Sequence, residues 1–151
     1  MRIEAFGAGM ELHRAGERAA AFARAGFDGL WLAEAGRTAY LICAASALAA
    51  PELRIGTAVA TAFPRSPMVT AQTAWELAEA TRGRFVLGLG TQIKAHIERR
   101  FSTVYDRPGA RLREYVLALR AIFRAFQGTE LIVLQASALP QCALTPERTA
   151  W

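Results

Sequence analysis

The sequence contains few of the residues that hold metal ions or form disulfides. Cysteine occurs only twice in 151 residues, at Cys43 and Cys142, and neither has a second cysteine at Cys-x-x-Cys spacing. This pattern excludes a disulfide framework and a zinc site built from paired cysteines. Free cysteines are commonly buried, and Cys43 lies in an alanine-rich stretch, so we expect it to be a packing residue.

Long apolar runs are also missing from the sequence. No run reaches the roughly 18 residues that span a bilayer. The nearest candidate, residues 39–50, is too short and too rich in alanine. The amino terminus carries Arg2 and Glu4 without the apolar stretch and cleavage site of a signal peptide. We therefore expect a cytoplasmic protein that has no membrane partner.

Lysine is almost absent, because Lys94 is the only lysine among 18 basic residues. The net charge of +5 raises the question of nucleic-acid binding. The arginines, however, are spread over several expected helices, usually near glutamate, and do not alternate with aromatic residues along one surface. We interpret the charge as that of solvated helix faces and expect no nucleic-acid partner.

Familiar catalytic signatures are missing as well. The sequence has no Ser/His/Asp or Cys/His arrangement, no phosphate loop and no His-Glu-x-x-His helix. Gly88 and Gly90 resemble the start of a dinucleotide-binding fingerprint, but the position of its third glycine is occupied by Ile93. That fingerprint also belongs at the first strand of a unit, whereas these glycines follow the fourth. We reject this interpretation.

Strand-like and helix-like segments alternate through most of the chain. Such alternation predicts an α/β domain with a parallel sheet and right-handed crossovers. Four strand–helix units fit either an open doubly wound sheet or half of an eightfold (β/α) barrel, whose usual size is about 250 residues. The expected strands cover residues 2–6, 27–33, 53–60 and 85–89, the last of them buried. The main expected helices cover residues 11–25, 38–50 and 67–80, and a further helix follows residues 107–109, with an apolar face over residues 112–126 that includes Tyr115 and an end at Gly128. Gly26 is expected to end the first helix, and Ser66 followed by Pro67 to begin the third, which should bury Val69, Gln72 or Thr73, and Trp75.

Polar side chains follow two of the expected strands where each strand ends. Glu34 comes after the second strand, and Thr91, Gln92 and His96 come after the fourth. The carboxyl ends of parallel strands share one rim, where α/β proteins bind ligands, so we expect a small-molecule site here. His96 is a candidate general acid or hydrogen-bond donor to a cofactor. Thr91 has a second interpretation, as the cap of the following helix.

Three stretches carry a family resemblance. They are residues 25–34 (AGFDGLWLAE), residues 54–72 (RIGTAVATAFPRSPMVTAQ) and residues 83–101 (GRFVLGLGTQIKAHIERRF). Together they closely resemble the luciferase-like monooxygenase superfamily, and the third is most similar to the branch of coenzyme F420-dependent oxidoreductases. The resemblance extends from about residue 2 to residue 128.

The resemblance implies an eightfold (β/α) barrel that transfers hydride through coenzyme F420, with FMN as the alternative cofactor, to or from a small-molecule substrate. It places a non-proline cis peptide at Ala58–Val59 in the third strand, where it forms a bulge behind the cofactor ring. Relatives often carry a catalytic histidine directly after the acidic residue of the second strand, but this chain has Ala35 there. The implied catalytic residues are His96 and Glu34, and the implied cofactor-binding residues are Ala58, Val59, Thr91, Gln92 and His96.

The last part of the chain departs from this resemblance. Members of the superfamily normally continue through four more strands, but residues 129–151 show no period after a strand-like run at residues 131–134. We expect residues 1–128 to be the amino-terminal half of a barrel and residues 129–151 to be an unrelated, truncated or frame-shifted reading. Such a half barrel exposes its first and fourth strands, which favours self-association. A non-catalytic fragment that acts only by self-association is the alternative function.

Overall fold

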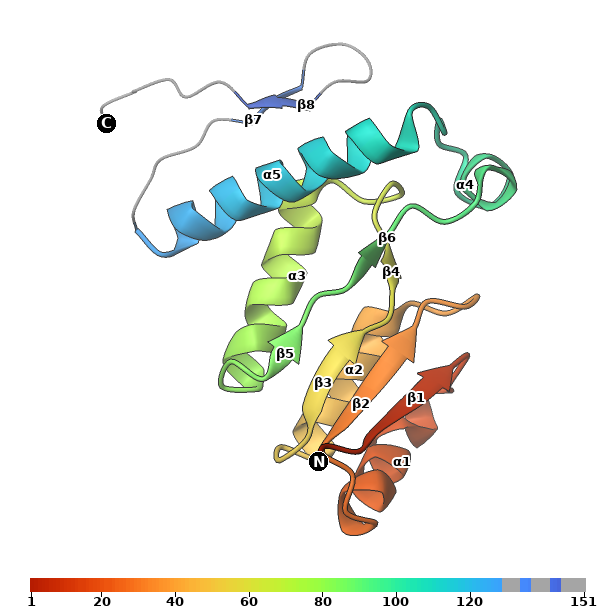
Figure 1. Cartoon of the computed structure of the whole chain (residues 1–151), viewed down its shortest axis with the longest axis vertical. Helices are drawn as coiled ribbons and strands as arrows, with labels where there is room; N and C mark the ends of the chain where they lie inside the picture. The colour runs from red at the N-terminus through yellow and green to blue at the C-terminus, as the bar shows by residue number, and fades with distance from the viewer. Residues whose placement is uncertain (129–133, 137–141, 145–151) are drawn as a thin grey trace. The chain divides into compact units, whose positions relative to one another are not determined.

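The computed structural model describes residues 1–128, 134–136 and 142–144 (Figure 1). The chain divides into two compact units, and each is described by itself. The first unit comprises residues 1–61 and 73–90, and the second comprises residues 62–72 and the chain from residue 91 onward. Most of the tail expected at residues 129–151, including residues 131–133 of the strand-like run, lies outside the described residues. The interpretation of that tail stays a prediction.

The first unit is built on a four-stranded parallel sheet in the order β1-β2-β3-β5 (Figure 1). Its main helices follow β1 and β2 in the chain, which confirms the expected alternation. The glycine expected to end the first helix does so, since Gly26 has a φ of +82° and its N–H donates to Ala23 O. The elements are β1 Glu4–Ala8, α1 Leu12–Arg24, β2 Gly29–Ala33, α2 Ala39–Ala49, β3 Arg54–Thr57 and β5 Phe85–Val86.

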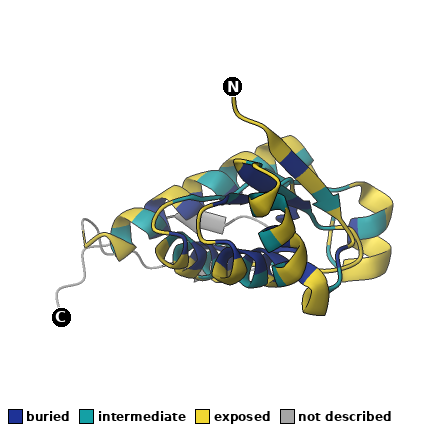
Figure 2. Cartoon of the chain, turned by 90° about the horizontal axis from the view of Figure 1, so that it is seen from below, coloured by how far each residue is buried: buried dark blue, intermediate teal, exposed yellow. Residues whose placement is uncertain are grey.

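The core of this unit lies between the sheet and helices α1 and α2, and Figure 2 colours its buried residues dark blue. Leu30, Leu32 and Ile55 are at most 1% exposed. The two helices approach closely, because a Cβ on Gly16 would lie only 3.1 Å from that of Ala49. Cys43 is fully buried here, which confirms its packing role.

The other face of the sheet carries no helix of the first unit. Side chains alternate along a strand, so Phe6, Trp31 and Gly56, which pair in register, face away from the core. The Trp31 ring lies over Gly56, where an added Cβ would come within 2.4 Å of the indole. Phe6 is 63% exposed.

The third strand is interrupted, contrary to the expectation of one strand over residues 53–60. β3 ends at Thr57 and a short strand, β4 Ala60–Thr61, follows; the peptide between Ala58 and Val59 is cis, as the resemblance implied. The fourth strand is interrupted too. β6 Leu89–Gly90 continues after β5 and pairs with β4 in a second small sheet.

Pairing shifts by one residue across this interruption. Gly56 pairs with Val86, and Ala60 pairs with Leu89, so the third strand carries one more residue than the fourth between these pairs. That arrangement is a β-bulge. Residues 85–89, expected to be buried, are half-buried, because β5 has a neighbouring strand on one side only among the described residues.

Helix α3, Pro67–Ala80, contributes residues to both units. Its start was predicted correctly: the Ser66 Oγ accepts a hydrogen bond from the Val69 N–H at 3.2 Å, and Pro67 is the first helical residue. Its buried face was predicted wrongly, because Val69 is 50% exposed. The buried face instead carries one threonine, two alanines and one leucine. The buried residues are Thr70, Ala71, Ala74 and Leu77.

The second unit is mainly helical. It contains α4 Lys94–Phe101, α5 Pro108–Phe126 and an antiparallel pair, β7 Leu134–Ala136 with β8 Cys142–Leu144. The buried face of α5 includes Tyr115, as expected, and its hydroxyl lies 2.5 Å from Thr70 Oγ1. None of the helices in the described part of the chain is long and apolar enough to cross a membrane.

Candidate functional site

Glu34 joins the end of β2 to both sides of the bulge. Its backbone N–H donates to Val59 O at 3.2 Å, and its carboxylate Oε2 accepts a hydrogen bond from the Thr61 N–H at 2.7 Å. The side chain is half-buried. A carboxylate that accepts a backbone hydrogen bond is held in one orientation, so Glu34 fixes the loop between β3 and β4.

Thr57 makes a second tie across the bulge. Its Oγ1 donates to Gly88 O at 2.7 Å and accepts from the Gly88 N–H at 2.9 Å. The same Gly88 O also accepts from the Ala60 N–H at 2.8 Å. Thr57 is 1% exposed and Gly88 is half-buried, so these bonds are partly shielded from water.

Val59 presents an apolar side chain at this rim. It is 47% exposed, and two glycines lie against it. A Cβ on Gly90 would come within 2.6 Å of Val59 Cγ2, and one on Gly88 would lie 3.6 Å from Val59 Cγ1. A side chain at Gly90 would therefore displace the valine, whereas the distance at Gly88 is that of an ordinary contact. Val59 is thus an exposed apolar side chain bordered by two residues that lack side chains, and the flat face of a ring can lie against such a group.

Thr91 and Gln92 belong to the second unit and are engaged locally. Thr91 Oγ1 donates to Gln92 O at 3.1 Å, and Gln92 Oε1 accepts from the Ile93 N–H at 3.1 Å. Helix α4 has Ile93 at its N-cap and no side-chain cap, so the interpretation of Thr91 as a helix cap is wrong. Gln92 has a φ of 59° and keeps its amide NH2 without a hydrogen bond to any described residue.

His96 lies in the first turn of α4. Its backbone N–H donates to Ile93 O at 3.1 Å. Its side-chain Nδ1 is buried and has no hydrogen-bond partner among the residues that the structure describes. A buried polar atom without a partner costs free energy, so it is a place where a bound group could supply the missing bond.

The structure brings Glu34, Ala58 and Val59 together in the first unit, while Thr91, Gln92 and His96 lie in the second. Their assignment to one cofactor site stays a prediction. Sequence reasoning missed the part played by Thr57, a polar residue at the end of an apolar strand. That position was the only available signal, because its partner Gly88 is 31 residues away in the chain.

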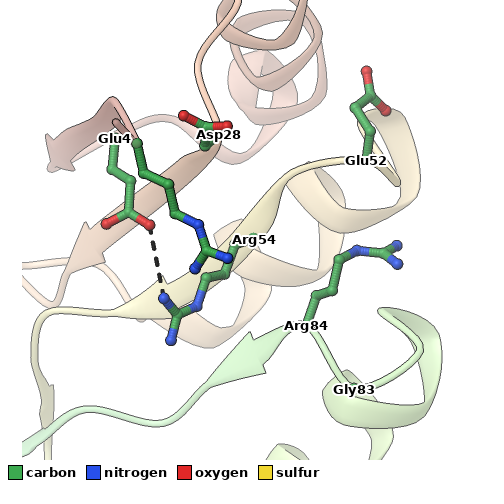
Figure 3. Close-up of a pocket in the computed structure, with 7 residues that line it drawn as sticks. Glu4, Asp28, Glu52, Arg54, Gly83 and Arg84 are labelled. Atoms are coloured by element: carbon green, nitrogen blue, oxygen red, sulfur yellow. Dashed lines mark ion pairs between the residues drawn. The ribbon is translucent and has the colours of Figure 1, made fainter.

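A cavity of about 380 Å³ lies at the opposite, amino ends of the strands (Figure 3). Two of its charged groups, Glu4 and Arg54, bind one another. Arg54 lies 3.8 Å from Glu4 and 5.4 Å from the Trp31 ring, while the Trp31 Nε1–H donates to Glu4 at 2.7 Å. Asp28 accepts from the Ile3 N–H at 2.7 Å. We assign this cavity a structural role. Its lining residues are Arg2, Glu4, Asp28, Glu52, Arg54, Gly83 and Arg84.

Comparison with known proteins gives a family match. The profile of a family described as luciferase-like monooxygenase matches residues 2–146, beyond residue 128 where the resemblance ended. An uncharacterized protein of Mycobacterium tuberculosis is 48% identical over 122 residues, which are 80% of this chain and 36% of that protein. A second M. tuberculosis protein, provisionally named a coenzyme F420-dependent oxidoreductase, is 34% identical over 71% of this chain and 31% of its own length.

Solved structures match the fold at low sequence identity. The FMN-bound oxygenating constituent of 3,6-diketocamphane monooxygenase from Pseudomonas putida has a TM-score of 0.74 and 16% identity, over 97% of this chain and 44% of that one. An F420-dependent secondary alcohol dehydrogenase has a TM-score of 0.71 and 18% identity, and the match covers 90% of this chain and 44% of that one. The chain thus spans about a third of the length of the curated relatives and under half that of the solved structures.

Proposed function

The chain belongs to the luciferase-like monooxygenase family, and from this premise we propose that it takes part in hydride transfer with coenzyme F420. The family consists of flavin- or F420-dependent oxidoreductases. Membership confirms the recognition from sequence, and the structural matches confirm the parallel α/β fold over part of a barrel. Because the chain spans only part of its relatives, the activity itself is a proposal.

The relative that is 34% identical supports F420 over FMN, because its provisional name specifies F420. Solved structures with either cofactor match the fold at under 25% identity, so they do not discriminate between the two. FMN stays the alternative cofactor. The proposed substrate is a small molecule, as expected from the rim that the strands share.

The observation that carries the proposal is the apolar surface of Val59, bordered by Gly88 and Gly90. When bound, a deazaflavin ring supplies the hydride chemistry, and the protein supplies orientation and electrostatics. In this chain Val59 would contact the face of the ring, and Glu34 would hold the loop that carries Val59.

His96 is the proposed proton-transfer residue. Its Nδ1 lacks a partner among the described residues, and the chain has Ala35 where relatives often have histidine. Glu34 is the alternative, but its Oε2 already accepts the Thr61 N–H, which favours a positioning role for this carboxylate. Thr91 and Gln92 are the further proposed contacts, and the Gln92 amide NH2, which bonds no residue in the described part of the chain, is the donor available to the cofactor.

Titration of the purified chain with coenzyme F420 and with FMN, followed by fluorescence, tests the proposal. We expect binding of F420 and loss of binding in Val59→Asp, because a charged side chain cannot contact the face of an apolar ring without desolvation. Val69→Asp is the matched control, since Val69 is 50% exposed on α3 and Val59 is 47% exposed. Failure of both cofactors to bind would refute cofactor use by this chain.

Self-association is a second candidate function, supported by β1. This strand is at one end of the sheet order. Phe6 in the strand is 63% exposed, and Ile3, which directly precedes the strand, is 50% exposed. An exposed strand edge with apolar side chains favours pairing with another strand. Sedimentation of the chain at increasing concentration should show a dimer or larger species if this proposal holds. A monomer that binds F420 tightly would contradict a purely self-associating role.

A further inference from the structure

We propose that Thr57 is a positioning residue whose hydroxyl fixes the bulge and thereby the surface on which the cofactor ring binds. This inference rests on the proposed function of the carboxyl rim. Thr57 itself faces away from solvent at 1% exposure, so it acts through the residues that it holds.

The hydroxyl replaces hydrogen bonds that the sheet cannot make at this point. The third and fourth strands pair at Gly56 and Val86 and again at Ala60 and Leu89. Between these pairs the third strand has three residues and the fourth has two, so the register shifts by one residue. A regular ladder needs equal numbers of residues on both strands, so within the gap the Gly88 N–H bonds a side chain in place of a backbone carbonyl, while Gly88 O keeps the Ala60 N–H. Thr57 Oγ1 satisfies the Gly88 N–H and also donates to Gly88 O.

The residue that Thr57 holds, Gly88, directly contacts the proposed binding surface. Gly88 O accepts from Ala60, the residue after Val59, and the Val59 side chain lies against Gly88 and Gly90. A shift of Gly88 would therefore also shift the backbone against which the Val59 side chain packs. Since a buried donor left without a partner is costly, the strands will rearrange when the hydroxyl is removed.

Thr81 provides a matched control at the other end of the fourth strand. It is 2% exposed, its Oγ1 donates to Leu77 O at 2.7 Å, and it accepts from the Phe85 N–H at 2.9 Å. A valine at either position keeps the shape of the side chain and removes the hydroxyl, which makes two hydrogen bonds at Thr57 and three at Thr81, where it also donates to Ala78 O at 3.2 Å. Only the change at Thr57 should alter the binding surface.

The test compares Thr57→Val, Thr57→Ser and Thr81→Val by thermal unfolding, by fluorescence titration with coenzyme F420, and by amide hydrogen exchange. Both valine variants should lower the melting temperature. We expect Thr57→Val to weaken F420 binding by about tenfold, the scale of one lost buried hydrogen bond. Thr81→Val should leave affinity within about twofold, and Thr57→Ser, which keeps the hydroxyl, should restore it.

Equal loss of affinity in the two valine variants, or no rescue by serine, would overturn the inference and leave Thr57 a stability residue only. Hydrogen exchange separates this failure from that of the proposed function. If the unsubstituted chain binds neither cofactor, the proposed function and the cofactor role of Thr57 fail together. Hydrogen exchange still decides whether Thr57 holds the bulge: faster exchange of the Gly88 amide in Thr57→Val supports this role, and unchanged exchange overturns it.

Should Thr57→Val not fold, Thr57→Cys replaces it. This variant should show a smaller loss of F420 affinity and a smaller rise in Gly88 exchange, because a thiol is a weak donor and acceptor.

Discussion

Replacing Gly88 with alanine should destabilise the first unit strongly, because the new methyl group has no space. A Cβ built on Gly88 would lie 2.1 Å from Thr57 O and 3.2 Å from Thr57 C. Both are backbone atoms, so no side-chain rotation relieves the overlap. Either the third or the fourth strand must shift.

The expected magnitude follows from three contributions. Overpacking costs about 1–3 kcal/mol, and occasionally more. A shift that breaks the two bonds between Thr57 Oγ1 and Gly88 costs about 1 kcal/mol for each bond. The reduced flexibility of the unfolded chain offsets about 0.4–1 kcal/mol of this. The net loss should be about 2–5 kcal/mol, a large share of a typical stability of about 5–15 kcal/mol.

Urea unfolding of Gly88→Ala measures this loss as a shift of the midpoint at constant slope. Gly109→Ala is the control, since nothing lies within 4 Å of the position that its Cβ would occupy and it lies in helix α5. Alanine is the better helix former, so this change should stabilise by about 0.5–1 kcal/mol. The packing argument would be refuted if Gly88→Ala stayed within about 0.5 kcal/mol of the unsubstituted protein.

Two further predictions concern buried groups. Tyr115→Phe should cost about 1–2 kcal/mol in urea unfolding, because it removes the partner of Thr70 Oγ1 at 2.5 Å and the donor to Ser66 O at 3.2 Å. Tyr105→Phe, whose hydroxyl bonds to no described residue, should cost less than about 0.5 kcal/mol, and equal losses would contradict this view of Tyr115. Burial raises the pKa of the Cys43 thiol from 9.0 to about 12. The fold thus favours the neutral thiol, and this contribution to stability, complete below about pH 9, is lost as the pH rises toward 12. In a Cys142→Ser background, iodoacetamide at pH 8 should therefore modify Cys43 only after denaturation, and rapid reaction of the folded protein would refute the burial argument.

Signals close together in the chain predicted their features well. Ser66 followed by Pro67 predicted the start of α3, and Gly26 predicted the end of α1, because capping depends on residues three or four positions apart. The face that α3 buries was not predictable in this way. It depends on Tyr115, whose hydroxyl bonds Thr70 from 45 residues away.

In the candidate site, too, features set by nearby residues or by a family motif were predicted, and contacts between distant residues were not. Glu34, Val59 and the paired glycines were identified because they follow strands or match a family pattern. The clamp of Glu34 on Thr61, the tie of Thr57 to Gly88 and the failure of Thr91 to cap α4 were not foreseen. The common role of Thr91, Gln92 and His96 stays a prediction.

The order of strands and helices, the parallel sheet and the family could be predicted from the chain alone, because hydrophobic period, caps and motifs are local properties, and the family resemblance also implied the bulge at Ala58–Val59. The register of the two strands across that bulge, and the hydrogen bonds that hold it, became known from the folded structure. A bulge is a mismatch between two strands. It exists only once Gly56 has paired with Val86 and Ala60 with Leu89, contacts that no local pattern encodes.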